Sequence, residues 1–216
     1  MKKILIYVGV NKGYGLYTLL TKNKYDLVYG FEPDPELYKD ITKLFSPYSF
    51  IKLINSACST STGTSKLYIT KNRCSTSLAE PNKEAFDPRC GDGIDVIDSI
   101  EVNTINLFDF ICENNIQEIE YLVLDTQGND LNILKTLTPL INERKIKTIF
   151  TETHKNGHFF YSGMDNQYDK FKELLDKNYE VSYFSADDTI INKEKDPNEL
   201  VQANEWDTCW TLKENI

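Results

Sequence analysis

Three carboxylates follow apolar runs of strand length, and they are the residues best placed to do chemistry. Apolar runs that end at residues 31, 124 and 151 are followed directly by Glu32, Asp125 and Glu152. In open α/β sheets, ligands bind outside the carboxyl ends of the parallel strands. A carboxylate there can accept hydrogen bonds from ribose hydroxyls or take a proton from an acceptor. We therefore expect Asp125 and Glu152 to face one crevice, with Glu32 at the end of a nearby strand.

A glycine-rich turn follows the first apolar run and reads Gly9-Val-Asn11-Lys-Gly13-Tyr-Gly15. Glycines let a backbone approach a ligand closely, and the helix that follows offers unpaired N–H groups. The turn matches neither the phosphate loop of NTPases nor a complete G-x-G-x-x-G motif. Glu32 stands about twenty residues further on, where nucleoside-binding folds place an acid for the ribose. Together, the glycine turn and Glu32 predict a nucleoside cofactor, which could be a nicotinamide dinucleotide or S-adenosylmethionine. The alternative for Glu32 is that its side chain only caps the next helix.

Strand-like runs alternate with segments of helical periodicity along the chain, which is typical of a parallel sheet covered by helices. We expect strands at 4–8, 25–31, 50–57, 65–70, 119–124, 146–151, 180–184 and 208–212, and helices at 14–20, 37–45, 105–112, 129–141 and 168–175. No linker or repeat interrupts the pattern. It predicts a single α/β domain over residues 1–216, with a doubly wound, mostly parallel sheet and an antiparallel strand near the C-terminus.

Residues 71–98 lack periodicity and contain two prolines and two glycines. Loops of this length in a compact domain are often lids or binding segments, so we expect a lid or acceptor loop here, with a disordered insert as the alternative. Trp206 and Trp210, four residues apart, are expected to share one side of the last strand and to pack in the core.

Composition excludes several classes of protein. Lys and Arg total 24 against 33 for Asp and Glu, a net charge of -9, which argues against binding long nucleic acid by bulk charge. No apolar run approaches the ~18 residues that span a bilayer, so we expect no membrane association. The five cysteines are scattered, without a C-x-x-C pair, and favour a reducing, cytoplasmic location. The sequence does not indicate an oligomeric state.

A series of motifs resembles the FkbM family of S-adenosylmethionine-dependent methyltransferases. The motifs are residues 8–13, 30–34, 55–57 leading to Gly63, 75–78 and 121–134, and the order and spacing match over about two thirds of the chain. The resemblance implies a Rossmann-like class I methyltransferase fold with S-adenosylmethionine as cofactor. It also implies an O-methyltransferase whose acceptor is a hydroxyl of a carbohydrate, glycan or small natural product.

The resemblance also assigns site residues. It places Gly9, Asn11 and Gly13 under the methionine part of the cofactor, Glu32 at the ribose, Ser56 and Ala57 beside the adenine, and Asp125 next to the transferring methyl group. Gln127 stands where many members carry Glu. Tyr7 stands where members usually carry an acid that helps to anchor the cofactor, so cofactor binding is expected to be weakened or lost. An inactive nucleoside-binding or scaffold protein therefore remains an alternative. A nicotinamide-dependent oxidoreductase is less favoured, because no Ser/Tyr/Lys set is evident.

Methyl transfer requires alignment of acceptor and donor and, for a hydroxyl, removal of a proton. We expect Asp125 to orient or deprotonate the acceptor, with Glu152 and His154 as assistants; capping of the following helix is the alternative for Asp125. We predict no metal site, and a site built from Asp125, Glu152 and His154 is the alternative. The aromatic residues just after His154, Phe159 to Tyr161, either line an acceptor pocket or pack as an ordinary loop.

Overall fold

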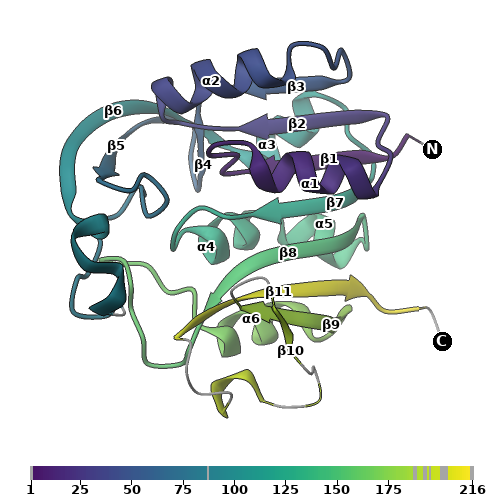
Figure 1. Cartoon of the computed structure of the whole chain (residues 1–216). Coiled ribbons are helices and arrows are strands. Elements are labelled where there is room, and N and C mark those ends of the chain that lie inside the picture. Colours follow the sequence, from purple (N-terminus) through teal and green to yellow (C-terminus); the bar gives the residue numbers. More distant parts are fainter. Residues whose placement is uncertain are drawn as a thin grey trace.

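An eight-stranded sheet runs through the computed structural model, which describes residues 2–86, 88–186, 189–191, 194, 196–199 and 204–214 (Figure 1). Its strands are β1 (Ile4–Val8), β2 (Leu27–Phe31), β3 (Ile51–Ile54), β7 (Ile119–Leu124), β8 (Ile146–His154), β9 (Tyr179–Ala186), β10 (Thr189–Ile191) and β11 (Glu205–Leu212). They lie in the order β10-β9-β11-β8-β7-β1-β2-β3. Five neighbouring strands, β3, β2, β1, β7 and β8, are parallel to one another. Strand β11 is antiparallel to both of its neighbours, β8 and β9. The mostly parallel sheet and its antiparallel C-terminal strand are therefore confirmed.

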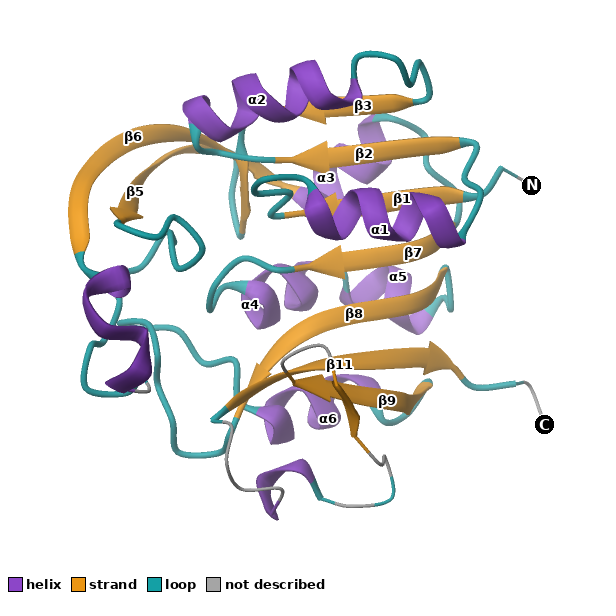
Figure 2. Cartoon of the chain, viewed as in Figure 1, coloured by secondary structure: helices purple, strands orange, loops and turns teal. Residues whose placement is uncertain are grey.

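Helices cover both faces of this sheet (Figure 2). One face carries α1 (Tyr14–Lys22) and α2 (Pro35–Phe45), and the other carries α3 (Leu107–Glu113), α4 (Asp130–Thr136), α5 (Thr138–Asn142) and α6 (Tyr168–Leu175). The side chains of β1 alternate between the two layers: Leu5 and Tyr7 pack with α1 and α2, and Ile4, Ile6 and Val8 pack in the opposite core. Both faces of β1 are therefore buried under helices, as expected for a central strand of a doubly wound sheet.

A smaller sheet stands beyond the carboxyl ends of the main strands. It comprises β4 (Ala57–Ser59), β5 (Gly63–Thr70) and β6 (Val96–Asn106), in the order β4-β6-β5. The single strand expected at 50–57 is instead two strands, β3 in the main sheet and β4 in the small sheet. The helix expected from residue 105 begins at Leu107, because residues 105–106 are the end of β6. The periodicity missed β6 because only two of its eleven side chains are buried, so the sequence gives little signal of a face packed in a core.

Two other boundaries also differ from expectation. The helix expected at 129–141 is interrupted at Leu137, just before Pro139, which stands in the first turn of α5 where its missing N–H costs nothing. The irregular segment after β5 ends at 95, since β6 begins at Val96, and it includes a 3₁₀ segment, η1 (Pro88–Ile94); a second, η2 (Pro197–Glu199), precedes β11.

The topology places a crevice at the carboxyl ends of β1 and β7. The chain progresses outward from β1 through β2 to β3 and then returns to β7 on the other side of β1, so the strand order reverses between them. On the same edge β8 continues to His154, so that Glu152 and His154 lie inside a strand paired with β11. Trp206 and Trp210 are buried in the core, as predicted.

No helix in the described ranges has both the length and the apolar character needed to cross a membrane.

Candidate functional site

A cavity of about 450 Å³ opens at this crevice, within the size range of small-molecule sites. Its wall contains six of the residues assigned to the cofactor from the sequence: Gly9, Asn11, Glu32, Ser56, Ala57 and Asp125. Gly13 does not line it. Gly13 has a φ of +84° at the start of α1, and a Cβ there would lie 3.0 Å from the ring of Phe45, so its role is to let α1 and α2 pack.

The glycine turn is fastened to both neighbouring strands. The N–H groups of Gly9 and Val10 donate to the carbonyl of Phe31 at 3.0 Å. A Cβ on Gly9, whose φ is +86°, would lie 1.9 Å from the carbonyl oxygen of Asp125. Only glycine fits here, and its absence of a side chain brings the turn against the end of β7.

Glu32 presents a buried carboxylate to the cavity and is 4% exposed. Its Oε2 accepts from the N–H of Asn11 at 2.7 Å and its Oε1 from the N–H of Asp34 at 2.9 Å. Burial raises the pKa of Glu32 to about 7, although both N–H groups act to lower it. Each oxygen keeps a lone pair, so the residue fits the two hydroxyls of a ribose. Glu32 does not cap α2, because Asp34 does so through the N–H groups of Glu36 and Leu37.

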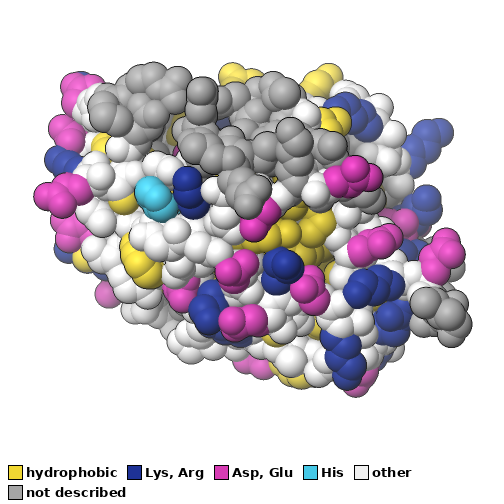
Figure 3. All heavy atoms as spheres, turned by 90° about the horizontal axis from the view of Figure 1, so that it is seen from below, with side chains coloured by type: hydrophobic (Ala, Val, Ile, Leu, Met, Phe, Trp, Pro, Cys, Tyr) yellow, Lys and Arg dark blue, Asp and Glu magenta, His cyan; other side chains and the backbone are white. Residues whose placement is uncertain are grey.

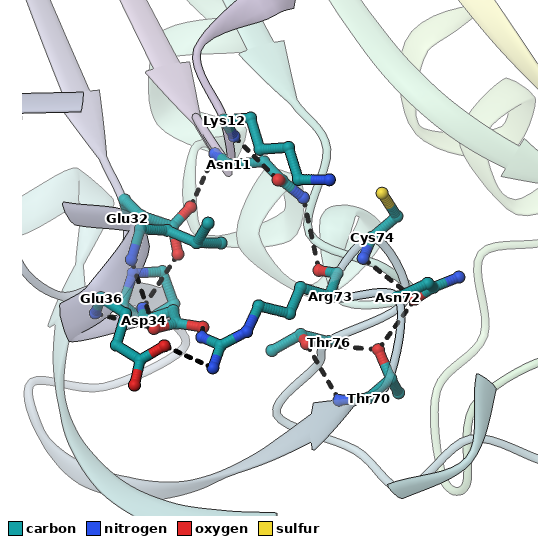
Figure 4. A network of polar contacts seen from close by, with 12 residues as sticks. Asn11, Lys12, Glu32, Asp34, Glu36, Thr70, Asn72, Arg73, Cys74 and Thr76 are labelled. Atoms are coloured by element: carbon teal, nitrogen blue, oxygen red, sulfur yellow. Dashed lines mark hydrogen bonds and ion pairs between the residues drawn. The ribbon is translucent and has the colours of Figure 1, made fainter. Parts of the chain in front are cut away.

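Arg73 fastens the segment after β5 across this part of the site (Figure 4). Its guanidinium pairs with Asp34 and, at 2.6 Å, with Glu36, while its carbonyl accepts from the side-chain amide of Asn11 at 3.4 Å. Residues 73, 74 and 76–78 thereby line one part of the cavity. Sequence reasoning missed Arg73, because it lies 39 residues from Asp34 in a segment without periodicity.

Asp125 also lines the cavity and is held by the polar turn after β7. Its Oδ1 accepts from the amide of Gln127 at 3.1 Å, and the same amide lies 3.3 Å from Oε1 of Glu152. The amide oxygen of Gln127 accepts from the hydroxyl of Tyr161 at 2.6 Å. Burial raises the pKa of Asp125, and the bond from Gln127 opposes the rise. Asp125 has no capping role, since Asn129 stands at the cap position of α4.

Glu152 and His154 do not line the cavity. Glu152 contacts the side-chain amide of Gln127, and His154 lies next to Glu152. Burial, followed by the charges of Glu205 and Asp125, holds the pKa of Glu152 well above its usual range. Burial lowers the pKa of His154 to about 3. His154 Nε2 lies 3.8 Å from Glu152 Oε2, too far for a hydrogen bond.

The aromatic residues after β8 pack mainly as a loop core. Phe160 and Tyr161 are buried against Ala79, Phe86 and Ile94 of the segment before β6, and only Phe159 is substantially exposed. The segments 79–94 and 159–164 therefore hold each other in place beside the site.

Tyr7 borders the cavity without filling it. A Cβ on Gly15 would lie 2.2 Å from the hydroxyl of Tyr7, so the phenol occupies the space beneath the start of α1 that Gly15 leaves open. Sequence reasoning noted the unusual tyrosine and the glycine but not that they depend on each other.

Comparison with known proteins gives one family and a common fold. The family described as the methyltransferase FkbM domain matches residues 8–183. The solved methyltransferase FkbM from Methylobacillus flagellatus KT aligns with 98% of this chain and 44% of its own, at 14% identity and a TM-score of 0.55. TrmK of M. capricolum, solved with S-adenosylhomocysteine, aligns with 98% of this chain and 63% of its own, at 12% identity and a TM-score of 0.49. The chain thus spans less than two thirds of either structure. No curated protein sequence matches it.

Proposed function

Because the chain belongs to the FkbM family of S-adenosylmethionine-dependent methyltransferases, we propose that it methylates a hydroxyl group of a carbohydrate, glycan or small natural product. The observation that carries the proposal is that two carboxylates, the buried Glu32 and the partly buried Asp125, line the same cavity. One suits the ribose of the cofactor and the other suits an acceptor hydroxyl. The glycine turn at Gly9 and Asn11 would hold the methionine part, and Ser56 and Ala57 would lie beside the adenine.

S-adenosylmethionine supplies a methyl group bound to a positively charged sulfur, which needs little covalent help from a protein. Asp125 would hold the acceptor hydroxyl by a hydrogen bond and take its proton as the methyl carbon leaves the sulfur for that oxygen, which leaves S-adenosylhomocysteine and the methylated acceptor. Its raised pKa makes it a better base than an exposed aspartate. Gln127 fixes the orientation of that carboxylate, and Glu152 assists through its contact with Gln127. His154 lies outside the wall, and we assign it no part in proton transfer.

Segment 71–98 serves in this proposal as the lid of the site. Its residues 73, 74 and 76–78 line the cavity, and Arg73 joins them to the start of α2. Ser77 Oγ also donates to the carbonyl of Gln127 at 2.7 Å, which links the lid to the acceptor side. A lid that touches both sides can exclude water from the transfer.

Surface charge favours a small or glycan acceptor over RNA. The chain carries a net charge of -9, and Figure 3 shows acidic and basic side chains intermingled on the face seen from below. Binding of long nucleic acid draws its affinity from gathered lysines and arginines.

The test has two stages. Calorimetric titration with S-adenosylmethionine, S-adenosylhomocysteine and NAD should show binding of the first two only; binding of NAD alone would favour an oxidoreductase. A panel of sugars, glycans, hydroxylated natural products and RNA is then assayed for S-adenosylhomocysteine release. Methyl transfer to a hydroxylated small molecule supports the proposal, transfer to RNA alone contradicts the acceptor class, and cofactor binding without any turnover favours a binding protein.

A further inference from the structure

A second polar cluster lies beside the cavity, on β8 and β11, which run next to each other (Figure 1). Glu205 stands directly opposite His154 in the antiparallel pairing of these strands. Glu152 is two residues before His154, so both side chains point to the same face of the sheet. One ligand-type atom from each of Glu152, His154 and Glu205 lies within 4.8 Å of the other two. The three residues therefore converge on one small volume.

Two atoms of this cluster are buried without a hydrogen-bond partner. They are His154 Nε2, on a side chain that is only 1% exposed, and Glu152 Oε2. Unpartnered buried polar atoms are rare in folded proteins, and a bound ion is one of the few explanations for them. The two atoms stand 3.8 Å apart. Neighbouring ligands of one metal ion, each bonded at about 2.1 Å, stand roughly 3.4 Å apart, so the gap has the size of an ion.

The surrounding charge also points to a cation. Asp130 is buried, Asp125 and Glu152 are partly buried close to it, and the described residues supply no lysine or arginine that pairs with any of the three. Buried charges in proteins are normally paired or bound to a metal. Asp34, in contrast, is a buried acid that has its cation in Arg73.

We propose that Glu152, His154 and Glu205 bind one divalent transition-metal ion. One imidazole and two carboxylates form a donor set that suits Mn²⁺ or Zn²⁺, whereas Mg²⁺ and Ca²⁺ prefer oxygen ligands alone. The ion would hold Glu152 in place and, through Gln127, the carboxylate of Asp125. This positioning role rests on the proposed methyl transfer, but binding of the ion does not.

The test is titration of Mn²⁺ into the metal-free full chain, without cofactor or acceptor. Binding is measured by calorimetry and by the loss of the electron paramagnetic resonance signal of free Mn²⁺. Mn²⁺ is the better probe because the exposed thiols of Cys74 and Cys112 would also bind Zn²⁺. We expect one ion per chain. Glu205→Gln and Glu152→Gln, which keep the shape of the side chain, should each weaken binding at least tenfold. His158→Gln, at a histidine outside the cluster, should leave it unchanged.

Thermal unfolding checks that the variants are folded, because a folded variant gives a cooperative transition. Mn²⁺ should raise the melting temperature of the unmodified protein but not that of Glu205→Gln. Absence of Mn²⁺ binding to the folded protein overturns the proposal, and so does binding that survives both glutamine substitutions. Failure of the proposed function is distinguishable, since it would leave ion binding intact while every acceptor remains unmethylated.

Discussion

Glu32→Gln should move the stability of the protein and its affinity for the cofactor in opposite directions. Burial raises the pKa of Glu32 from 4.5 to about 7. The folded state then holds this proton more tightly than the unfolded state, so the contribution of Glu32 to stability falls as the pH rises from 4.5 to 7. Above pH 7 the carboxylate is ionised and destabilises the fold by roughly 3 kcal/mol.

Glutamine removes this cost but keeps one acceptor oxygen for the two N–H groups of Asn11 and Asp34. The lost hydrogen bond costs about 1–2 kcal/mol, which leaves a net gain of about 1–2 kcal/mol at pH 8 and none at pH 5. For a chain of this length the gain corresponds to a rise in melting temperature of roughly 2–8 °C. Affinity for S-adenosylhomocysteine should fall at least tenfold, because the new amide group donates where the ribose needs an acceptor.

The assays are thermal unfolding and calorimetric titration of both proteins at pH 5.5 and 8. The affinity of the unmodified protein for S-adenosylhomocysteine should weaken below pH 7. The affinity of Glu32→Gln should not show this pH dependence, and the comparison separates titration of Glu32 from titration of the ligand itself. Glu113→Gln, at an exposed site on α3, controls for the loss of a charge. Unchanged affinity in Glu32→Gln would refute the ribose role, and equal stability of the two proteins at pH 8 would refute the reasoning on burial.

Three further substitutions test other parts of the site. Asp125→Asn should lower turnover about 10²–10⁴-fold while affinity for S-adenosylhomocysteine changes little, measured by initial rates and calorimetry; equal losses would remove Asp125 from proton transfer. Gly15→Ala should cost about 1–3 kcal/mol in thermal unfolding because its Cβ meets the hydroxyl of Tyr7, and Tyr7→Phe should cancel most of that cost; strictly additive effects would contradict the contact. Arg73→Ala should destabilise the chain by about 1–3 kcal/mol in urea and speed dissociation of S-adenosylhomocysteine, since Asp34 loses its cation. Glu36→Gln, at a side chain 75% exposed, should cost less than about 1 kcal/mol and is its control.

The sequence was sufficient for the main sheet because that sheet is built from strongly apolar strands. β1, β2 and β7 are nearly continuous runs of buried residues, and each ends at a glycine turn or a carboxylate. The small sheet was not predictable in the same way. β6 carries charged and polar side chains over most of its length and is held by its pairing with β5, which is a long-range contact. The single domain over residues 1–216 and the lid at 71–98 stay predictions.

The lining of the cavity was predictable where it depends on local backbone and not where distant segments meet. Gly9 and Glu32 follow from strand ends and turn chemistry, which neighbouring residues in the sequence determine. Arg73 reaches the cavity wall, and Glu205 reaches Glu152 beside it, from segments whose positions only the fold defines. The extension of β8 to His154 has the same cause, because pairing with β11 and not local propensity continues that strand.

Two kinds of buried acid meet at this edge of the sheet, and the difference between them separates structure from function. Asp34 is buried, caps α2 and pairs with Arg73, so its charge is compensated and contributes to the fold. Glu32 is buried and Asp125 is partly buried; both have raised pKa values and line a cavity, so in the absence of a ligand their charges oppose folding near neutral pH. A ligand that donates hydrogen bonds to them would recover that free energy as affinity. Carboxylates that are costly in the empty fold and useful on binding are expected at a functional site, and for that reason the proposed site rests more on these two residues than on the glycines.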